Sequence, residues 1–139
     1  MKKYLIPAMC ALASTISSSI IAAPLPKEIY SQFSTLNVAN PAKDIDLTDG
    51  VLSIKINVDA PIPEIMGKNA IFTETCINMV QHPKIWKKYP VKQIRATTLV
   101  EWQAYIFHGG QKECTEYHTK EGASDKYTNP PYLELWRRG

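Results

Sequence analysis

Residues 44–58 read DIDLTDGVLSIKINV, and this stretch decides the fold class. Apolar and polar side chains alternate on both sides of an Asp-Gly pair at 49–50, which favours a two-residue type I′ turn between antiparallel strands. That turn places Ile45 beside Ile54 and leaves one face of the hairpin apolar. A hairpin of this kind predicts an antiparallel sheet that packs against another layer.

Two amphipathic helices are predicted, one before and one after this hairpin. Residues 26–36 begin with a proline suited to a first helical turn and continue with apolar side chains at helical spacing. Residues 68–82 carry an apolar stripe of the same period, which includes Cys76. Pro83 follows directly and is expected to end or kink the second helix.

Three further strands are predicted in the C-terminal half. Residues 92–107 are rich in β-branched and aromatic side chains and are expected to form one long strand. The apolar face of that strand consists of Val100, Trp102, Ala104 and Ile106. Residues 111–119 are expected to return antiparallel to it, and the stretch YLELW at 132–136 is expected to form the last strand.

Residues 105–118, YIFHGGQKECTEYH, hold the predicted turn of this second hairpin and the densest group of reactive side chains. A two-residue Gly-Gly loop would turn Cys114 away from the apolar face. A three-residue loop that starts at His108 puts glycine where a left-handed backbone is favoured, and it pairs Ala104 with Cys114. We therefore expect the second register, in which Cys114 faces the helix packed above the sheet.

The cysteines predict a single disulfide. Cys10 lies in the N-terminal apolar segment, so a secreted form of the chain keeps only Cys76 and Cys114. An even pair in an oxidising compartment is typical of a disulfide, and the expected helix and hairpin place the two cysteines opposite each other. Closing a loop of this length stabilises a fold by roughly 4 kcal/mol in the chain-entropy model.

The N-terminal segment has the pattern of a secretory signal peptide. Two lysines precede an apolar run from 4 to 13, and small residues end the segment at Ala22 and Ala23. A transmembrane anchor is the alternative, but it needs about 20 continuous apolar residues, and several serines interrupt this run. We therefore expect a signal peptide at 1–23, a single domain at 24–139 without a transmembrane segment, and a periplasmic or secreted location.

The net charge argues against a general nucleic-acid binder. The full chain has a formal net charge of +3, and loss of the two N-terminal lysines lowers this balance to about +1. No nucleic-acid partner is therefore predicted, and a charged partner must be recognised by a local patch.

Ligand spacing argues against a bound metal. Zinc ligands usually come in close pairs, and neither the two cysteines nor His82, His108 and His118 form one. An EF-hand is disfavoured because the glycine of residues 44–55 falls one place late and Lys55 replaces the final glutamate. No metal and no cofactor is predicted.

Catalysis is an alternative without a clear motif. A serine nucleophile lacks the G-x-S-x-G context, and a cysteine nucleophile requires the disulfide to be absent. Glu101, Glu113 and Glu116, with the histidines of the 101–118 hairpin, are the acids and bases available to a small hydrolase. Alternating charges on the outer face of a sheet are usually just solvated, so no catalytic residue is assigned.

Basic and aromatic residues mark two candidate binding segments. The first contains no acidic residue and consists of Lys84, Trp86, Lys87, Lys88, Tyr89, Lys92 and Arg95. The second is the C-terminal group of Trp136, Arg137 and Arg138. Such mixtures bind anionic surfaces, and arginine and aromatic side chains are common anchors of protein interfaces. The alternative is that Trp86 and Tyr89 pack on the core while the lysines remain in water.

Together these patterns predict an α+β fold: a small antiparallel sheet of two hairpins and a C-terminal strand, a helix on one face, a short N-terminal helix and one disulfide. The favoured function is an exported binding module that acts by protein recognition, such as an inhibitor, an immunity-type protein or an envelope-assembly accessory. A small envelope hydrolase and a peripheral envelope component are the alternatives. The expected partner is an envelope protein or an anionic envelope surface.

Overall fold

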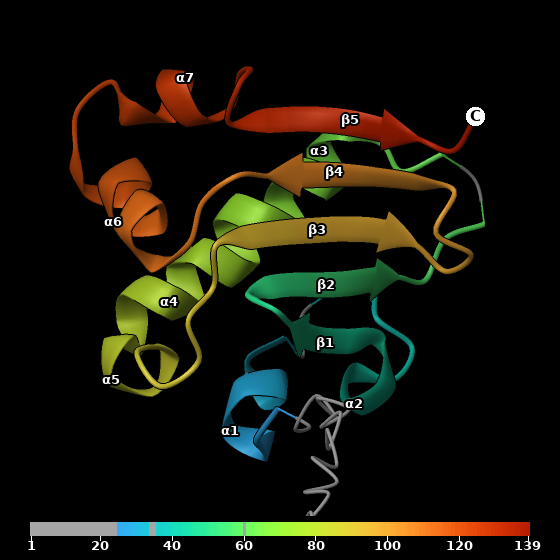
Figure 1. Cartoon of the computed structure of the whole chain (residues 1–139), viewed down its shortest axis with the longest axis horizontal. Helices are drawn as coiled ribbons and strands as arrows, with labels where there is room; N and C mark the ends of the chain where they lie inside the picture. Colours follow the sequence, from blue (N-terminus) through green and yellow to red (C-terminus); the bar gives the residue numbers. More distant parts are fainter. Residues whose placement is uncertain (1–24, 34–35, 60) are drawn as a thin grey trace, which may run out of the picture.

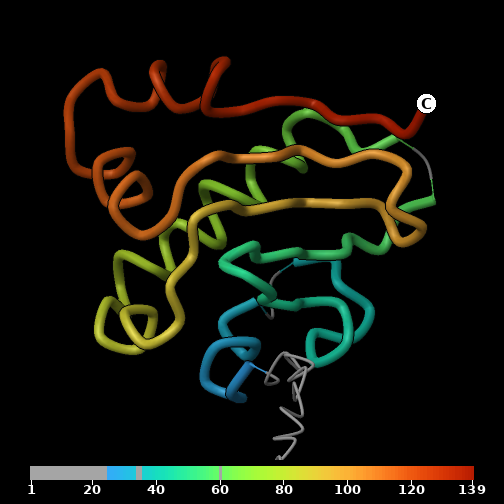
Figure 2. Tube along the Cα trace, in the orientation of Figure 1, coloured from blue at the N-terminus to red at the C-terminus, as the bar shows by residue number. Residues whose placement is uncertain are grey.

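A computed structural model describes residues 25–33, 36–59 and 61–139. Its centre is a five-stranded sheet in the order β1-β2-β3-β4-β5, formed by Ile45–Thr48, Val51–Ile56, Gln93–Thr98, Gln103–Phe107 and Leu133–Arg137. All neighbouring strands are antiparallel except β2 and β3, which are parallel. Figure 2 shows the first described residues beside the β1 edge and the C-terminus beside the β5 edge. The predicted α+β class, with a mainly antiparallel sheet, is confirmed.

The first hairpin has the predicted geometry. β1 and β2 pair with Ile45 opposite Ile54, which is the expected register. The turn consists of Asp49 and Gly50, whose φ angles of 52° and 78° are both positive, as a type I′ turn requires. Every second side chain of β2 is buried, so one face of the hairpin enters the core.

A helical crossover from β2 to β3 covers one face of the sheet. It consists of α3 (Glu64–Lys68), the π-helical η2 (Asn69–Cys76) and α4 (Ile77–Gln81), and α5 (Pro83–Trp86) follows. The wide π turn is supported by Thr75, whose buried hydroxyl donates to the carbonyl of Ala70 at 2.7 Å. The predicted helix over 68–82 is thus confirmed, although it begins at Glu64. Figure 1 shows α3 and α4 behind the sheet.

The expectation of one long strand over 92–107 is wrong. β3 ends at Thr98 and β4 begins at Gln103, and a tight turn joins them. Glu101 has a φ of 51° in this turn, a left-handed backbone that is uncommon outside glycine and asparagine. Val100, expected on the apolar face, is 68% exposed in the same turn. No glycine or proline marks the turn, so the sequence does not indicate it.

The two faces of β4 are also reversed relative to the prediction. Tyr105 faces the helical layer, because a Cβ on Gly67 of α3 would lie 2.2 Å from its ring. Phe107 packs edge-on against Phe72 of η2, with ring centroids 5.0 Å apart. The even-numbered residues of β4 therefore face away from the helices. All five side chains of β4 are buried, so alternation in hydropathy does not distinguish its faces.

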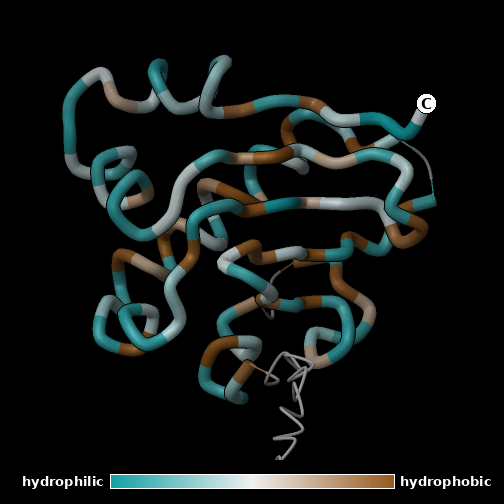
Figure 3. Tube along the Cα trace, viewed as in Figure 1, coloured by the Kyte–Doolittle hydropathy of each residue, from teal (hydrophilic) through white to brown (hydrophobic). Residues whose placement is uncertain are grey.

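The predicted return strand over 111–119 is a helix. These residues form α6 (Gln111–Thr119), and Cys114 is buried within it. Gly110 precedes the helix, where a Cβ would lie 1.7 Å from the carbonyl oxygen of Val91. The Glu113 carboxylate accepts a hydrogen bond from the Gly110 N–H at 2.9 Å, half of a capping box. Figure 3 shows α6 as largely hydrophilic, so few apolar side chains reveal its helical period.

The predicted disulfide is confirmed, although its setting differs from the prediction. Cys76 of η2 and Cys114 of α6 are fully buried and joined by an S–S bond of 2.08 Å, with their Cα atoms 4.8 Å apart. The bond links η2 to α6, which lies at one end of the sheet, and the expected pairing of Cys114 with Ala104 is wrong. A stacked contact of Phe72 with Tyr117, at 4.4 Å between centroids, joins the same two helices.

The remaining elements are short. Residues 27–33 form α1 (Lys27–Tyr30) and η1 (Ser31–Phe33), within the helix expected over 26–36, of which residues 34–35 lie outside the described residues. α2 (Pro41–Asp44) precedes β1, and α7 (Ala123–Tyr127) follows α6. The predicted last strand is confirmed as β5. Within the described ranges, no helix has both the length and the apolar character needed to cross a membrane.

Candidate binding face of the sheet

The face of the sheet opposite the helices carries an ordered cluster of side chains, which we call the open face. Its residues are the outward members of four strands: Ser53 and Lys55 of β2, Arg95 and Thr97 of β3, Ala104 and Ile106 of β4, and Glu134 and Trp136 of β5. Figure 1 views the sheet from this side, and none of the described helices crosses it. Among the described residues, helices thus cover the sheet on one face only.

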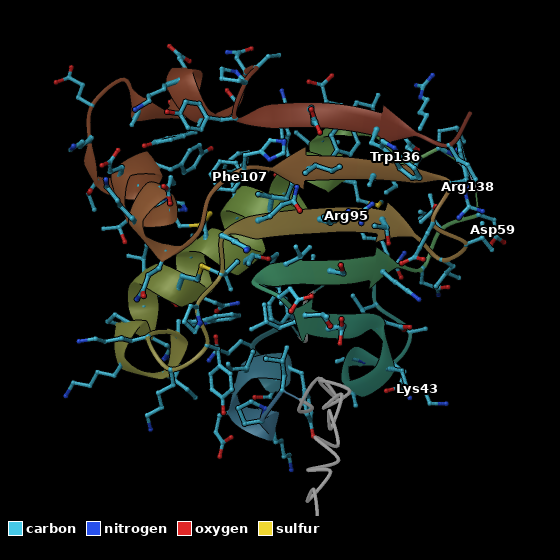
Figure 4. All side chains as sticks on the ribbon, viewed as in Figure 1. Lys43, Asp59, Arg95, Phe107, Trp136 and Arg138 are labelled. Carbon is cyan, nitrogen blue, oxygen red and sulfur yellow. A yellow bond between two sulfur atoms is a disulfide. The ribbon has the colours of Figure 1, made fainter. Side chains whose placement is uncertain are left out.

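Arg95 and Trp136 form the centre of the open face. They lie on β3 and β5, with β4 between them, and the guanidinium carbon of Arg95 is 5.7 Å from the centroid of the Trp136 ring. Ala104, which pairs with Trp136, has a small side chain that leaves room for this contact. Figure 4 shows both side chains on the near side of the sheet. A guanidinium over an indole is a favourable cation–π arrangement.

Two polar atoms of the open face have no hydrogen-bond partner. Arg95 Nε and Thr97 Oγ1 are both buried and unpaired within the described structure. Thr97 is 1% exposed, although none of the described helices crosses the open face. A buried polar group without a partner costs about 1–3 kcal/mol. The open face therefore holds two buried polar atoms that no described residue pairs.

Arg95 also has no carboxylate partner among the described residues. Lys55, the other cation of the open face, has its Nζ 3.9 Å from Oε1 of Glu101. Glu134 lies two strands away from Arg95, and its Oε1 is 3.3 Å from Nε2 of His108. Both nearby carboxylates thus lie close to other side chains, and the charge of Arg95 remains available to a partner.

The structure divides the predicted basic segment between two surfaces. Arg95 joins the open face, whereas Lys84, Lys87 and Lys88 are exposed on α5 and the turn that follows it. Trp86 is 1% exposed and its indole N–H donates to Gln32 Oε1 at 3.1 Å, so it packs in the core as the alternative reading expects.

The other predicted binding residues lie outside the centre of the open face. Tyr89 is half-buried against the core, and Lys92 is exposed with its aliphatic stem close to Gly50. Arg137 and Arg138 are exposed at the end of β5. Of the C-terminal group, Trp136 lies against the Arg95 guanidinium.

The acids and bases of the alternative hydrolase are not gathered at one site. Glu113 caps α6, and His118 Nε2 lies 2.9 Å from the carbonyl oxygen of Phe72. Glu101 lies beside Lys55 at the opposite end of β4 from His108. The hairpin that was to unite them is replaced by α6. In the part of the chain that the structure describes, no group of three or more His, Cys, Asp or Glu side chains is placed to hold a metal ion.

Glu116 belongs instead to a contact between α6 and α7. Its carboxylate accepts a hydrogen bond from the Tyr127 hydroxyl, and Lys120 Nζ lies 3.5 Å from it. The Tyr127 hydrogen bond, aided by Lys120, lowers the pKa of Glu116 below its ordinary value. The same hydrogen bond raises the pKa of Tyr127, and the hydrogen bond to Tyr127 raises the pKa of Lys126. A carboxyl group held ionised in this way is poorly suited to act as a general acid.

Several residues of the open face are not singled out by the sequence. Ser53 occupies an outward position of β2, and the clean alternation of that strand is a signal that identifies it. Thr97 and Ile106 lie in β3 and β4, where side chains on both faces are buried. Alternation carries no information there, so only the tertiary structure places these two residues beside Arg95 and Trp136.

Comparisons of this chain with protein families, with curated proteins and with solved structures found no match. Its function must therefore be argued from its own surfaces.

Proposed function

We propose that this chain is an exported recognition module that binds a partner protein through the open face of its sheet. The partner places a carboxylate on Arg95 and an apolar side chain against Trp136. The observation that carries the proposal is Arg95, a half-buried residue whose guanidinium lies over Trp136 and has no ion-pair partner within the described residues. Arginine and tryptophan are the residue types that dominate binding energy at protein interfaces.

The composition of the open face supports a protein partner. The half-buried Trp136, backed by the buried Ala104 and Ile106, supplies an apolar centre, and the pairs Lys55–Glu101 and His108–Glu134 lie at its polar rim. An apolar centre with a polar rim is the usual layout of a protein interface. A carboxylate from the partner would neutralise the one arginine that the centre contains.

Export is part of the proposal and is supported by two observations. Residues 1–23 have the pattern of a signal peptide, and the Cys76–Cys114 disulfide is of a kind that persists in oxidising compartments. The disulfide also braces the helical layer that supports the sheet. A braced surface loses less conformational entropy on binding, which favours affinity.

Affinity capture followed by substitution tests the proposal. The oxidised protein is immobilised, the proteins retained from an envelope extract are identified by mass spectrometry, and the Kd of each purified candidate is measured. Arg95→Met and Trp136→Ala should each weaken binding of the true partner by about 2 kcal/mol or more, which raises Kd roughly thirtyfold. Arg137→Met is the matched control, because this exposed arginine has the opposite strand parity to Trp136 and lies outside the Arg95–Trp136 contact, and it should leave Kd nearly unchanged.

Arg95→Met also separates binding from stability. Methionine keeps an apolar stem on Trp136 but removes the buried Nε, whose missing hydrogen bond costs about 1–3 kcal/mol. The variant should therefore be at least as stable as the wild type in urea unfolding while it loses the partner. A partner whose Kd resists both substitutions contradicts the proposal. So does an Arg95→Met protein that is clearly less stable, because Arg95 would then be a structural residue.

A further inference from the structure

Four exposed lysines from two distant parts of the chain form one surface, which we call the lysine surface. Lys84 lies in α5, Lys87 and Lys88 follow it, and Lys112 lies in the first turn of α6. The two helices are joined, since Gln111 Nε2 donates to the carbonyl of Pro83 at 3.1 Å. A cavity of about 230 Å³ between them is lined by Lys87 and Lys112, among others. Figure 1 shows α5 and α6 at the same end of the sheet.

The positive charge of the described chain is concentrated on this surface. None of the four lysines forms an ion pair with a described carboxylate. Of the 16 Lys and Arg residues, two precede residue 25 and four form the lysine surface, so ten remain against 13 Asp and Glu residues. The rest of the described chain is therefore net acidic. This uneven distribution of charge orients the molecule so that the lysine surface faces a negatively charged partner.

Two carboxylates border the lysine surface. Glu113 lines the cavity between α5 and α6, but its carboxylate is hydrogen-bonded to the N–H of Gly110. Glu28 lines, together with Lys84, a groove of about 690 Å³ between α1 and α5. These two charges leave the surface with an excess of positive charge.

The residue types at the lysine surface favour a lipid bilayer over a protein. Protein interface cores are depleted of lysine and enriched in arginine and aromatic anchors. Trp86 is buried in the core, so this segment presents no tryptophan anchor. Ammonium groups on flexible stems suit a diffuse layer of anionic headgroups. Tyr89, half-buried beside the lysines, is a residue type common at the headgroup level.

We propose that the lysine surface docks this protein on a bilayer that contains anionic lipids. The attraction is electrostatic and requires no inserted segment. In Figure 1 the α5 end lies at one corner of the molecule while the open face points towards the viewer. A docked molecule therefore keeps Arg95 and Trp136 accessible, and the docking is independent of the protein recognition proposed above.

Vesicle co-sedimentation of the purified, oxidised protein tests the docking. The probes are vesicles of phosphatidylcholine alone and of phosphatidylcholine mixed with phosphatidylglycerol. The protein should bind the mixed vesicles only, and added salt should weaken that binding. The triple variant Lys84→Gln/Lys87→Gln/Lys88→Gln should lower the partition coefficient about fivefold per lysine. Its thermal midpoint should not change, because all three side chains are exposed.

The triple variant Lys43→Gln/Arg137→Gln/Arg138→Gln is the matched control, because it removes the same charge elsewhere. These side chains are exposed, and Figure 4 places Lys43 and Arg138 at the other end of the sheet from α5. The control should bind the mixed vesicles with nearly wild-type affinity. Absence of binding to mixed vesicles, or an equal loss in both triple variants, overturns the proposal. Equally tight binding to polyglutamate in the same salt overturns the assignment to lipid.

Discussion

At the scale of single residues, the open face is distinguished by buried polar atoms that have no hydrogen-bond partner among the described residues. Native proteins pair nearly all such atoms, as Thr75 does through the carbonyl of Ala70. The buried side-chain atoms without a partner in the described structure are Arg95 Nε and Thr97 Oγ1, and both lie on the open face. Their confinement to one face distinguishes the open face from the rest of the described structure.

Tyr127→Phe should reduce stability in a pH-dependent way. The Tyr127 hydrogen bond lowers the pKa of Glu116 in the folded state, so it stabilises the fold when Glu116 is ionised. This contribution is fully present above the ordinary pKa of 4.5 and is lost as the pH falls through the lower folded value. The difference in thermal midpoint between wild type and variant should be largest at neutral pH and shrink as the pH is lowered past 4.5.

Tyr132→Phe is the matched control for this measurement. Its ring packs against Tyr127 at 4.8 Å, but its hydroxyl forms no hydrogen bond with the described residues. Its effect on the thermal midpoint should not vary with pH in this range. A pH-independent loss in Tyr127→Phe would show that packing, rather than the bond to Glu116, accounts for the effect.

At the scale of helices and strands, two glycines allow segments of the chain to approach each other closely. A Cβ on Gly67 of α3 would lie 2.2 Å from the Tyr105 ring of β4. A Cβ on Gly110, directly before α6, would lie 1.7 Å from the carbonyl oxygen of Val91. At both positions the two segments approach more closely than a side chain would allow, so the glycines help to fix where α3 and the start of α6 lie.

Gly67→Ala tests the approach of α3 to β4. Alanine favours a helix over glycine by about 1 kcal/mol, but its methyl group must displace the buried Tyr105 ring, and overpacking costs about 1–3 kcal/mol. Because the overlap with the ring is severe, we expect a net loss of about 1–2 kcal/mol in the free energy of unfolding, measured in urea.

A double-mutant cycle provides the control. In a Tyr105→Leu background the smaller side chain leaves room for the methyl group, so Gly67→Ala should be neutral or stabilising there. An equal penalty in both backgrounds would mean that the contact with the ring is not its cause.

At the scale of the whole molecule, the Cys76–Cys114 disulfide joins two distant parts of the chain. Cys76 lies in the crossover between β2 and β3, and Cys114 lies after β4, with a sequence separation of 38. The bond therefore closes a loop that contains both strands of the β3–β4 hairpin. Small domains are stable by only about 5–15 kcal/mol, so such a cross-link is a large share of the total.

Cys76→Ala/Cys114→Ala should lower the free energy of unfolding by about 4 kcal/mol, the chain-entropy value for this loop length. Alanine is chosen because both sites are fully buried, and serine would leave an unpaired hydroxyl there. Urea unfolding measures the loss, and the m-value should rise because the open chain exposes more surface. Reduced wild type, which keeps both sulfur atoms, is the control. A double variant as stable as oxidised wild type would refute the expectation.

Sequence-based prediction fails here where a strand is buried on both faces or a helix is mostly polar, because hydropathy then shows no clear strand or helix period. β4 is buried on both faces, so its sequence alternation does not indicate which side faces the helices. The turn at Glu101 lacks glycine and proline, and residues 92–107 therefore resemble one strand. The Gly-Gly pair before α6 is typical of a hairpin, yet Gly110 is required here by its contact with Val91.

The amino-acid sequence by itself determined the first hairpin, the crossover helix and the pairing of Cys76 with Cys114, because turn chemistry, helical period and cysteine number are local or compositional properties. Only the tertiary structure decided that Cys114 lies in a helix, that the lysines of α5 adjoin Lys112, and that Arg95 rests on Trp136. These arrangements depend on contacts between segments far apart in the chain. The free energy of such contacts is not contained in any local pattern of residues.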